Sequence, residues 1–139
     1  MKKRAGVIIY NQMKKTILLI KRIKYNQTYW VIPGGTVEAD ESFIDAALRE
    51  AAEELNLNNL KSSDLTPFIK INIDTVEHQY YLYITNQQLE VQIVGEELNR
   101  MTPSNRYFLE WISLSEIESL NLKPEECIPF IIQLAHDKK

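Results

Sequence analysis

Hydrophobic residues along the chain fall into short runs typical of β-strands and two stretches with helical spacing. β-Branched and aromatic residues predict strands at residues 5–10, 16–21, 29–32, 65–73, 76–85 and 107–113. Apolar positions at i, i+4, i+7 and i+11 predict a helix over residues 42–55, namely Ile44, Leu48, Ala51 and Leu55. A closing helix is predicted over residues 124–136, and one or two helical turns at residues 115–119. This order predicts an α/β fold in which helices pack on the faces of a mixed β-sheet.

Polar and turn-forming residues separate these elements. Residues 11–15 suit a hairpin loop between the first two strands. The Pro33-Gly34-Gly35 triplet is expected to end the third strand, because proline and glycine interrupt regular structure. Residues 95–105 are expected to form a long loop. The chain shows no internal repeat and no flexible linker that would divide it.

Length and charge limit the class of protein. The chain has 139 residues, which predicts a single domain over residues 1–139, and its 45% hydrophobic content suffices for one compact core. A net charge of −3 gives no electrostatic footprint for duplex nucleic acid, so such a partner is not expected. The apolar run near the N-terminus is too short for a signal peptide or a membrane span. We therefore expect a cytoplasmic protein without membrane association.

The chain has one cysteine, Cys127. A single thiol excludes an internal disulfide and cannot supply a cysteine-rich zinc site. A partly buried, small hydrophobic side chain is a far commoner role for such a residue than a nucleophile, so we expect Cys127 to be structural.

The central helix carries three glutamates on one side. At about 100° per residue, Glu50, Glu53 and Glu54 lie within an arc of roughly 100° that points away from the apolar stripe. A solvated acidic face is the usual interpretation of such a pattern. Two observations oppose it: residues 36–60 contain no lysine, and like charges at Glu50 and Glu54 cost about 0.2–0.5 kcal/mol unless they are neutralised. A divalent cation would remove that cost.

The ligand chemistry of this helix predicts a hard cation. Carboxylate oxygens select Mg²⁺, with Mn²⁺ as a substitute, and Mg²⁺ commonly shares its remaining positions with water and substrate phosphates. Arg49 is the nearby cationic side chain and could pair with Glu53 or Glu41. The upstream glycines allow close approach of the backbone, so they could form a wall of the same site. These features together indicate phosphate chemistry.

Residues 34–57 read GGTVEADESFIDAALREAAEELNL. This segment resembles the Nudix box, a pattern of spaced glycine, glutamate and arginine positions. The fixed positions are occupied by Gly35, Glu41, the Arg49-Glu50 pair and the Glu53-Glu54 pair. Residues 4–9, 18–22 and 110–112 are also similar to the family. The box departs from the pattern at its last glycine, which is Asn56 here, the next best residue for a left-handed helix end.

The resemblance implies a Nudix-type α/β/α sandwich around a mixed sheet. It also implies Mg²⁺-dependent attack of water on phosphorus in a nucleoside diphosphate linked to another group. By this resemblance Glu50, Glu54 and Glu53 are expected metal ligands, together with the backbone carbonyl of Gly34. Glu41 and Arg49 are expected to support the loop and helix. Glu50 and Glu53 compete for the role of orienting or deprotonating the water.

Residues outside the box offer further candidates. A later carboxylate could join the metal site, and Glu96 or Glu97 is the expected source, although a surface acidic pair is an equal alternative. The segment 102–107 could contact substrate, and within it Arg106 could meet a phosphate, while a solvated arginine is the commoner role. Substrate contacts are also expected from Gly35, Tyr29 and Tyr81.

Aromatic and imidazole side chains outside the box have structural alternatives. Tyr25, Tyr29 and Trp30 could stack on a base, but core packing is the stronger interpretation for Trp30. His78 could act as a general base, yet a hydrogen-bonded structural histidine is the commoner case.

The substrate stays open at this level. Nucleoside triphosphates, nucleotide sugars, ADP-ribose, dinucleoside polyphosphates and capped RNA ends all carry the bond that the box would hold. The absence of a long basic patch in the sequence disfavours RNA. A catalytically silent nucleotide sensor with the same fold is the alternative function, and the presence of every box glutamate argues against it. The closing helix suits either core packing or a homodimer surface.

Overall fold

A computed structural model describes residues 2–87, 89, 91–92 and 101–136. In these residues eight strands form one mixed sheet, in the order β5-β6-β1-β2-β3-β8, while β4 pairs with β1 and β7 pairs with β2. The strands are β1 Lys2–Asn11, β2 Thr16–Lys24, β3 Gln27–Val31, β4 Gly34–Thr36, β5 Thr66–Ile73, β6 Val76–Thr85, β7 Asn105–Ser113 and β8 Leu122–Lys123. The α-helices are α1 Phe43–Leu55 and α3 Ile128–Ile132.

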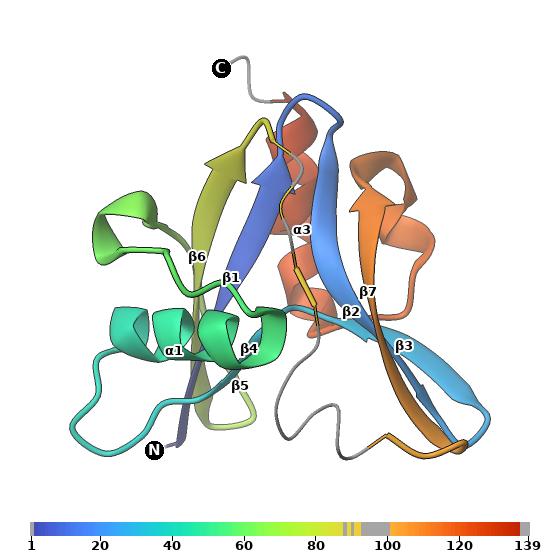
Figure 1. Cartoon of the computed structure of the whole chain (residues 1–139), viewed down its shortest axis with the longest axis horizontal. Coiled ribbons are helices and arrows are strands. Elements are labelled where there is room, and N and C mark those ends of the chain that lie inside the picture. Colours follow the sequence, from blue (N-terminus) through green and yellow to red (C-terminus); the bar gives the residue numbers. More distant parts are fainter. Residues whose placement is uncertain (1, 88, 90, 93–100, 137–139) are drawn as a thin grey trace.

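The sheet divides because β1 and β2 separate below their hairpin. They pair only at Tyr10↔Ile17 and Asn11↔Thr16. Farther from the hairpin, β1 pairs with β4 and, in parallel, with β6, whereas β2 pairs with β3 and β7. Figure 1 shows the two strands joined at the top of the view and apart at the bottom. We call the space between the separated strands the β1/β2 fork, and it contains the site described below.

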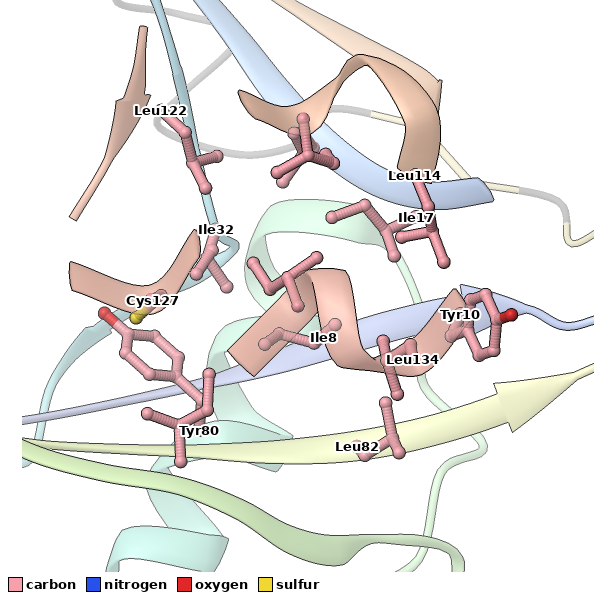
Figure 2. Close-up of a cluster of buried hydrophobic side chains, with 14 residues drawn as sticks. Ile8, Tyr10, Ile17, Ile32, Tyr80, Leu82, Leu114, Leu122, Cys127 and Leu134 are labelled. Atoms are coloured by element: carbon pink, nitrogen blue, oxygen red, sulfur yellow. The ribbon is translucent and has the colours of Figure 1, made fainter. Parts of the chain in front are cut away.

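Each face of the sheet has its own hydrophobic core. The strand β1 is buried on both sides, since Val7 and Ile9 face one core and Ile8 and Tyr10 face the other. The first core lies under α1. The second core packs the closing helical turns against the sheet, and Figure 2 shows Leu114, Leu122, Cys127 and Leu134 in the same cluster as Ile8 and Tyr80. Helices on both faces of a mixed sheet confirm the predicted sandwich.

The helix α1 forms where the sequence predicts it. Its N-cap is Ser42, whose hydroxyl accepts a hydrogen bond from the Asp45 N–H at 3.1 Å. Its C-cap is Asn56, with φ 59° and ψ 28°, which confirms the left-handed end expected in place of glycine. The stripe is shifted from the prediction, because Ala46 and Ala47 are fully buried. These small side chains let the helix lie close to the sheet.

The structure differs from the sequence prediction at two places. The third strand ends before the Pro33-Gly34-Gly35 triplet, as predicted, but Gly34–Thr36 then forms a further strand, β4, which pairs with β1. The closing helix is broken into a 3₁₀ turn Glu125–Cys127, the α-helix Ile128–Ile132 and a second 3₁₀ turn Gln133–His136. Pro129 lies in the first turn of α3 and has no N–H to continue a longer helix from Pro124.

Most other element boundaries differ by a few residues. The strands β1, β2 and β7 extend beyond the predicted ranges, and β3 begins two residues and ends one residue earlier than predicted. The two-residue strand β8 was not predicted because its hydrophobic pattern is too short to detect. The turns at residues 115–119 are a 3₁₀ helix, Leu114–Ser119. Most of the loop expected at residues 95–105 lies outside the described residues. In the part of the chain that the structure describes, no helix has the length and apolar character needed to cross a membrane.

Candidate active site

A polar cavity of about 370 Å³ lies in the β1/β2 fork. Its walls come from five strands and α1, which approach one another only in the folded chain. The lining residues are Arg4, Ile20, Arg22, Val31, Ile32, Gly34, Gly35, Thr36, Glu50, Glu54 and Tyr107. The cavity thus combines two carboxylates, two guanidinium groups and a glycine-containing backbone wall.

Glu54 joins the helix to the glycine-containing strand. Its carboxylate accepts a hydrogen bond from the Gly34 N–H at 2.7 Å. Gly34 pairs with Gly6 on β1, and a Cβ at Gly34 would overlap the Ala5 carbonyl oxygen. The absence of a side chain therefore lets β4 lie against β1 while presenting its amide to Glu54.

Glu50 lies one helical turn before Glu54 and faces the same cavity. A Cβ at Gly35 would overlap the Glu50 carboxylate, so this glycine makes room for the acid. The Glu50 side chain is only 14% exposed. Burial raises its pKa above the ordinary glutamate value, although the Arg49 guanidinium opposes that shift. A second cationic partner would therefore stabilise the ionised form.

Arg49 connects the loop before α1 to a glutamate within the helix. Its Nε donates to Glu41 Oε2 at 2.8 Å, its Nη1 donates to Glu50 Oε2 at 2.9 Å, and its Nη2 donates to the Thr36 carbonyl at 2.9 Å. The hydrogen bond from Arg49 lowers the pKa of Glu41, and Glu41 in turn raises the pKa of Arg49. Arg49 thereby fixes the distance between the loop before α1 and the carboxylate of Glu50.

The structure separates Glu53 from the other two glutamates. Its side chain is 60% exposed, lies 3.4 Å from Arg49 Nη1 and does not line the cavity. Glu50 and Glu54 share a face because they are four residues apart, whereas Glu53 is turned about 100° from Glu54. Within the described residues no three acidic, histidine or cysteine side chains converge as a metal-binding group. The three carboxylates lie on one side of the helix, but Glu50 and Glu54 line the cavity whereas Glu53 does not.

The donor set of the cavity still fits a hard divalent cation. Mg²⁺ needs only one or two carboxylates, because water and substrate phosphates complete its shell. Glu50 and Glu54 supply two carboxylates on one wall, and Glu50 carries a raised pKa that a cation would oppose. Roles for Glu53 and for the Gly34 carbonyl as ligands stay predictions.

The other expected site residues lie in different places. Arg106 extends over the Phe108 ring, with its Cζ 5.9 Å from the ring centroid, and does not line the cavity. Tyr29 lies beside a cavity residue, with its ring centroid 5.7 Å from the Cζ of Arg22. Tyr81 is buried in the core under α1 and its hydroxyl donates to Gln79. Their substrate roles stay predictions, and Glu96 and Glu97 lie outside the described residues.

His78 and Trp30 have structural environments. The buried His78 ring has Nδ1 3.1 Å from the Tyr80 hydroxyl and does not line the cavity. Burial lowers its pKa, with a further contribution from Arg4. Trp30 packs against the second core and donates from Nε1 to Glu110 at 2.9 Å. Cys127 is fully buried, where partial burial was expected, and burial raises its thiol pKa to about 12.

No site role was predicted for the cavity residues Arg4 and Arg22, whereas Tyr107 belongs to the segment 102–107 that was expected to contact substrate. Arg4, Arg22 and Tyr107 lie far apart in the chain and meet only through the strand pairing β2–β7 and the course of β1. A charged residue beside an apolar strand carries no signal of its own, because such residues are common at strand ends.

The family model described as the NUDIX domain matches residues 1–130. The chain belongs to the Nudix family. The Nudix assignment covers the strands, the helix and the cavity described above.

Two curated relatives match parts of this Nudix domain. A Bacillus subtilis (strain 168) protein, named provisionally as an 8-oxo-dGTP diphosphatase, is 33% identical over 84 residues, covering 60% of this chain and 54% of the relative. The m7GpppN-mRNA hydrolase NUDT17 of Danio rerio is 30% identical over 101 residues, covering 62% of this chain and 34% of the relative. The matches thus span about half or less of these relatives' own lengths.

Solved structures show the same Nudix fold over nearly the whole chain. A MutT structure, from work on Aliivibrio salmonicida and Vibrio cholerae, has a TM-score of 0.69 at 20% identity and covers 97% of both chains. A C. elegans Ap4A hydrolase has a TM-score of 0.68 at 21% identity and covers 96% of both chains. At these identities the likeness shows the fold and leaves the substrate open.

Proposed function

We propose that this Nudix domain is a Mg²⁺-dependent pyrophosphohydrolase that cleaves a phosphoanhydride bond in a nucleoside diphosphate linked to another group. The observation that carries the proposal is the pairing of Glu50 and Glu54 along one wall of a cavity that Arg4 and Arg22 also line. Carboxylates can hold a divalent cation, while guanidinium groups favour phosphate oxygens. Family membership supports the same reaction class.

Glu50 and Glu54 would hold the cation, with Glu53 and the Gly34 carbonyl as further expected ligands and Mn²⁺ as a substitute. A bound divalent ion would polarise the phosphoryl oxygens and lower the pKa of a bound water. Of the two glutamates expected to orient the water, the cavity position favours Glu50 over the exposed Glu53. Arg49 would keep the Glu50 carboxylate in place through its 2.9 Å hydrogen bond.

The cavity supports a small substrate held mainly by its phosphates. The relatives carry names that refer to 8-oxo-dGTP, a capped mRNA and Ap4A, so the family spans several leaving groups. For this chain we propose a small nucleotide as the substrate. We also propose that the protein is cytoplasmic and that it acts as the single domain predicted from the sequence. A homodimer is an untested alternative to the monomer.

A nucleotide panel tests this function. The protein is incubated with Mg²⁺ and nucleoside triphosphates, including oxidised ones, nucleotide sugars, ADP-ribose and dinucleoside polyphosphates, and the products are identified by mass. We expect a nucleoside monophosphate and a second phosphate-containing product from at least one compound. Tight binding without turnover would instead support the nucleotide-sensor alternative and contradict the hydrolase proposal.

A further inference from the structure

Among the residues that the structure describes, two arginines line the cavity without a hydrogen-bonded anionic partner. Arg4 on β1 makes no side-chain hydrogen bond or ion pair with any residue that the structure describes, although it lines the cavity. Arg22 on β2 also lines it and, within the same described residues, has no carboxylate partner. The two strands are those that separate at the fork (Figure 1). The two guanidinium groups are therefore on different elements, one on each branch of the fork.

Arg22 is held in a defined orientation by aromatic residues. Its Nη2 donates to the Tyr107 hydroxyl at 2.8 Å, and its Cζ lies 4.4 Å from the Tyr107 ring centroid and 5.7 Å from that of Tyr29. Its Nε is buried and has no hydrogen-bond partner among the described residues. A fixed cation with an unpaired buried donor has an energetic cost that a structural role would ordinarily avoid. Such a cost is expected where a ligand later supplies the counter-charge.

Aromatic contact alone does not explain this arrangement. Arg106 also lies over a ring, that of Phe108, but it is exposed and outside the cavity. Arg22 differs because it contacts two rings, donates a hydrogen bond to the Tyr107 hydroxyl and lines the cavity. Planar guanidinium groups bind phosphate oxygens through paired hydrogen bonds, which a lysine cannot reproduce.

Arg4 lies on the side of the cavity where β1 pairs with β4, the strand at the start of the Nudix box. It is opposite Thr36 of β4 in the strand register, and its charge acts to lower the pKa of Glu50. Glu50 already has Arg49 as a hydrogen-bonding partner, so the Arg4 guanidinium can serve a different anion.

We propose that Arg4 and Arg22 bind two different phosphate groups of the substrate, one from each side of the fork. This inference rests on the proposed function for its substrate class, and it names the residues that recognise the phosphate chain. Tyr107 is a positioning residue, since its hydroxyl and ring hold Arg22 in place. A ligand with two linked phosphates engages both arginines, whereas a single phosphate reaches one of them.

Calorimetric binding of inorganic pyrophosphate and inorganic phosphate in the presence of Mg²⁺ tests the proposal without requiring turnover. We expect Arg4→Gln and Arg22→Gln each to weaken pyrophosphate binding by about tenfold or more, because each loses a charge-assisted contact. In the double variant, the affinity for pyrophosphate should fall by the product of the two single-variant factors. For inorganic phosphate, at most one variant should weaken binding. Lys24→Gln removes a positive charge from the exposed end of β2 and should bind like the wild type.

Further variants separate recognition from folding. Arg22→Lys keeps the charge and should recover only part of the affinity, while Tyr107→Phe should weaken pyrophosphate binding less than Arg22→Gln does. Thermal unfolding verifies that each variant is folded. The proposal is overturned if the wild type does not bind pyrophosphate, or if both glutamine variants bind it with normal affinity. It is also overturned if both variants lose affinity for pyrophosphate and for phosphate by the same factor.

The nucleotide panel distinguishes this failure from failure of the proposed function. Arginine-dependent pyrophosphate binding without hydrolysis of any nucleotide would support the phosphate site and contradict the hydrolase. Normal hydrolysis by both glutamine variants would support the hydrolase and overturn the roles of Arg4 and Arg22.

Discussion

At the scale of single residues, the two cavity glutamates have different surroundings despite their shared helix face. Glu50 is largely buried beside Arg49, whereas Glu54 accepts the Gly34 N–H. A side chain that combines a backbone contact with a proposed catalytic charge can be tested by removing only the charge. Glutamine retains an oxygen acceptor of nearly the same shape, so it preserves the contact and removes the negative charge.

We predict that Glu54→Gln lowers kcat by about two to three orders of magnitude, the range typical for loss of one electrostatic contributor, and leaves thermal stability close to that of the wild type. The amide oxygen of the introduced glutamine can still accept the Gly34 N–H. Steady-state kinetics on the substrate found in the panel, with a thermal melt, measure both quantities. The matched control is Glu53→Gln, which changes the same charge outside the cavity and should lose less activity. Near-normal turnover by Glu54→Gln would remove Glu54 from the site.

Glu41 provides a residue-scale test through pH. The hydrogen bond from Arg49 lowers its pKa in the folded state, so its stabilising effect is present above the unfolded value of 4.5 and is lost as pH falls through the lowered folded value. We predict that Glu41→Gln destabilises the protein by about 1–2 kcal/mol at neutral pH, because glutamine replaces a hydrogen bond to a charged group with a weaker, neutral one. The difference from the wild type should shrink in acid.

Urea denaturation of the wild type and Glu41→Gln across the acid range measures this difference. Glu38→Gln is the control, because Glu38 is 69% exposed and 3.7 Å from Arg49 Nε, and exposed ion pairs contribute little. An equal loss of stability in both variants, or a Glu41→Gln effect that does not change with pH, would contradict the role of the Arg49–Glu41 pair.

At the scale of elements, α1 shows how much local sequence determines. Its start, its length and its left-handed end follow from Ser42, the apolar spacing and Asn56, and each was predictable without the fold. The strand β4 was not, because glycines carry no hydrophobic pattern and its pairing depends on close approach to β1. The contact between Arg22 and Tyr107 was not predictable either, since 85 residues separate them in the chain. Local chemistry predicted the carboxylate wall of the site, while the arginine-bearing walls required the sheet topology.

The left-handed end of α1 gives an element-scale prediction. Asn56 adopts φ 59°, a conformation that costs most side chains about 1–2 kcal/mol and glycine almost nothing. We predict that Asn56→Ala destabilises the protein by about 1 kcal/mol, while Asn56→Gly is neutral or stabilising. Chemical denaturation of the matched pair measures the difference, and activity should be retained in both folded variants. Equal stability of the alanine and glycine variants would show that the backbone conformation does not set the cost.

At the scale of the whole molecule, the sheet connects the site to the core on its opposite face. The strand β1 carries Arg4 into the cavity, and Arg4 is in register with His78 on β6. His78 contacts the Tyr80 hydroxyl, and Figure 2 shows Tyr80 beside Cys127 in the second core. The charge of Arg4 on β1 lowers the pKa of His78, whereas the charge of Glu126 in the closing turns raises it.

This connection predicts how global stability responds to pH. Burial lowers the pKa of His78 in the folded state below the unfolded value of 6.5, so the unfolded chain binds the proton first as the solution is acidified. Between the two pKa values the unfolded state holds more protons, and the free energy of unfolding therefore falls as pH decreases through about 6.5. His78→Gln keeps a hydrogen-bonding side chain without this titration, so its stability relative to the wild type should improve steadily below that pH. Thermal melts of the wild type, His78→Gln and the exposed-site control His136→Gln measure the trend, which only His78→Gln should alter. A pH dependence identical in all three proteins would mean that protonation of this core histidine does not contribute to acid unfolding.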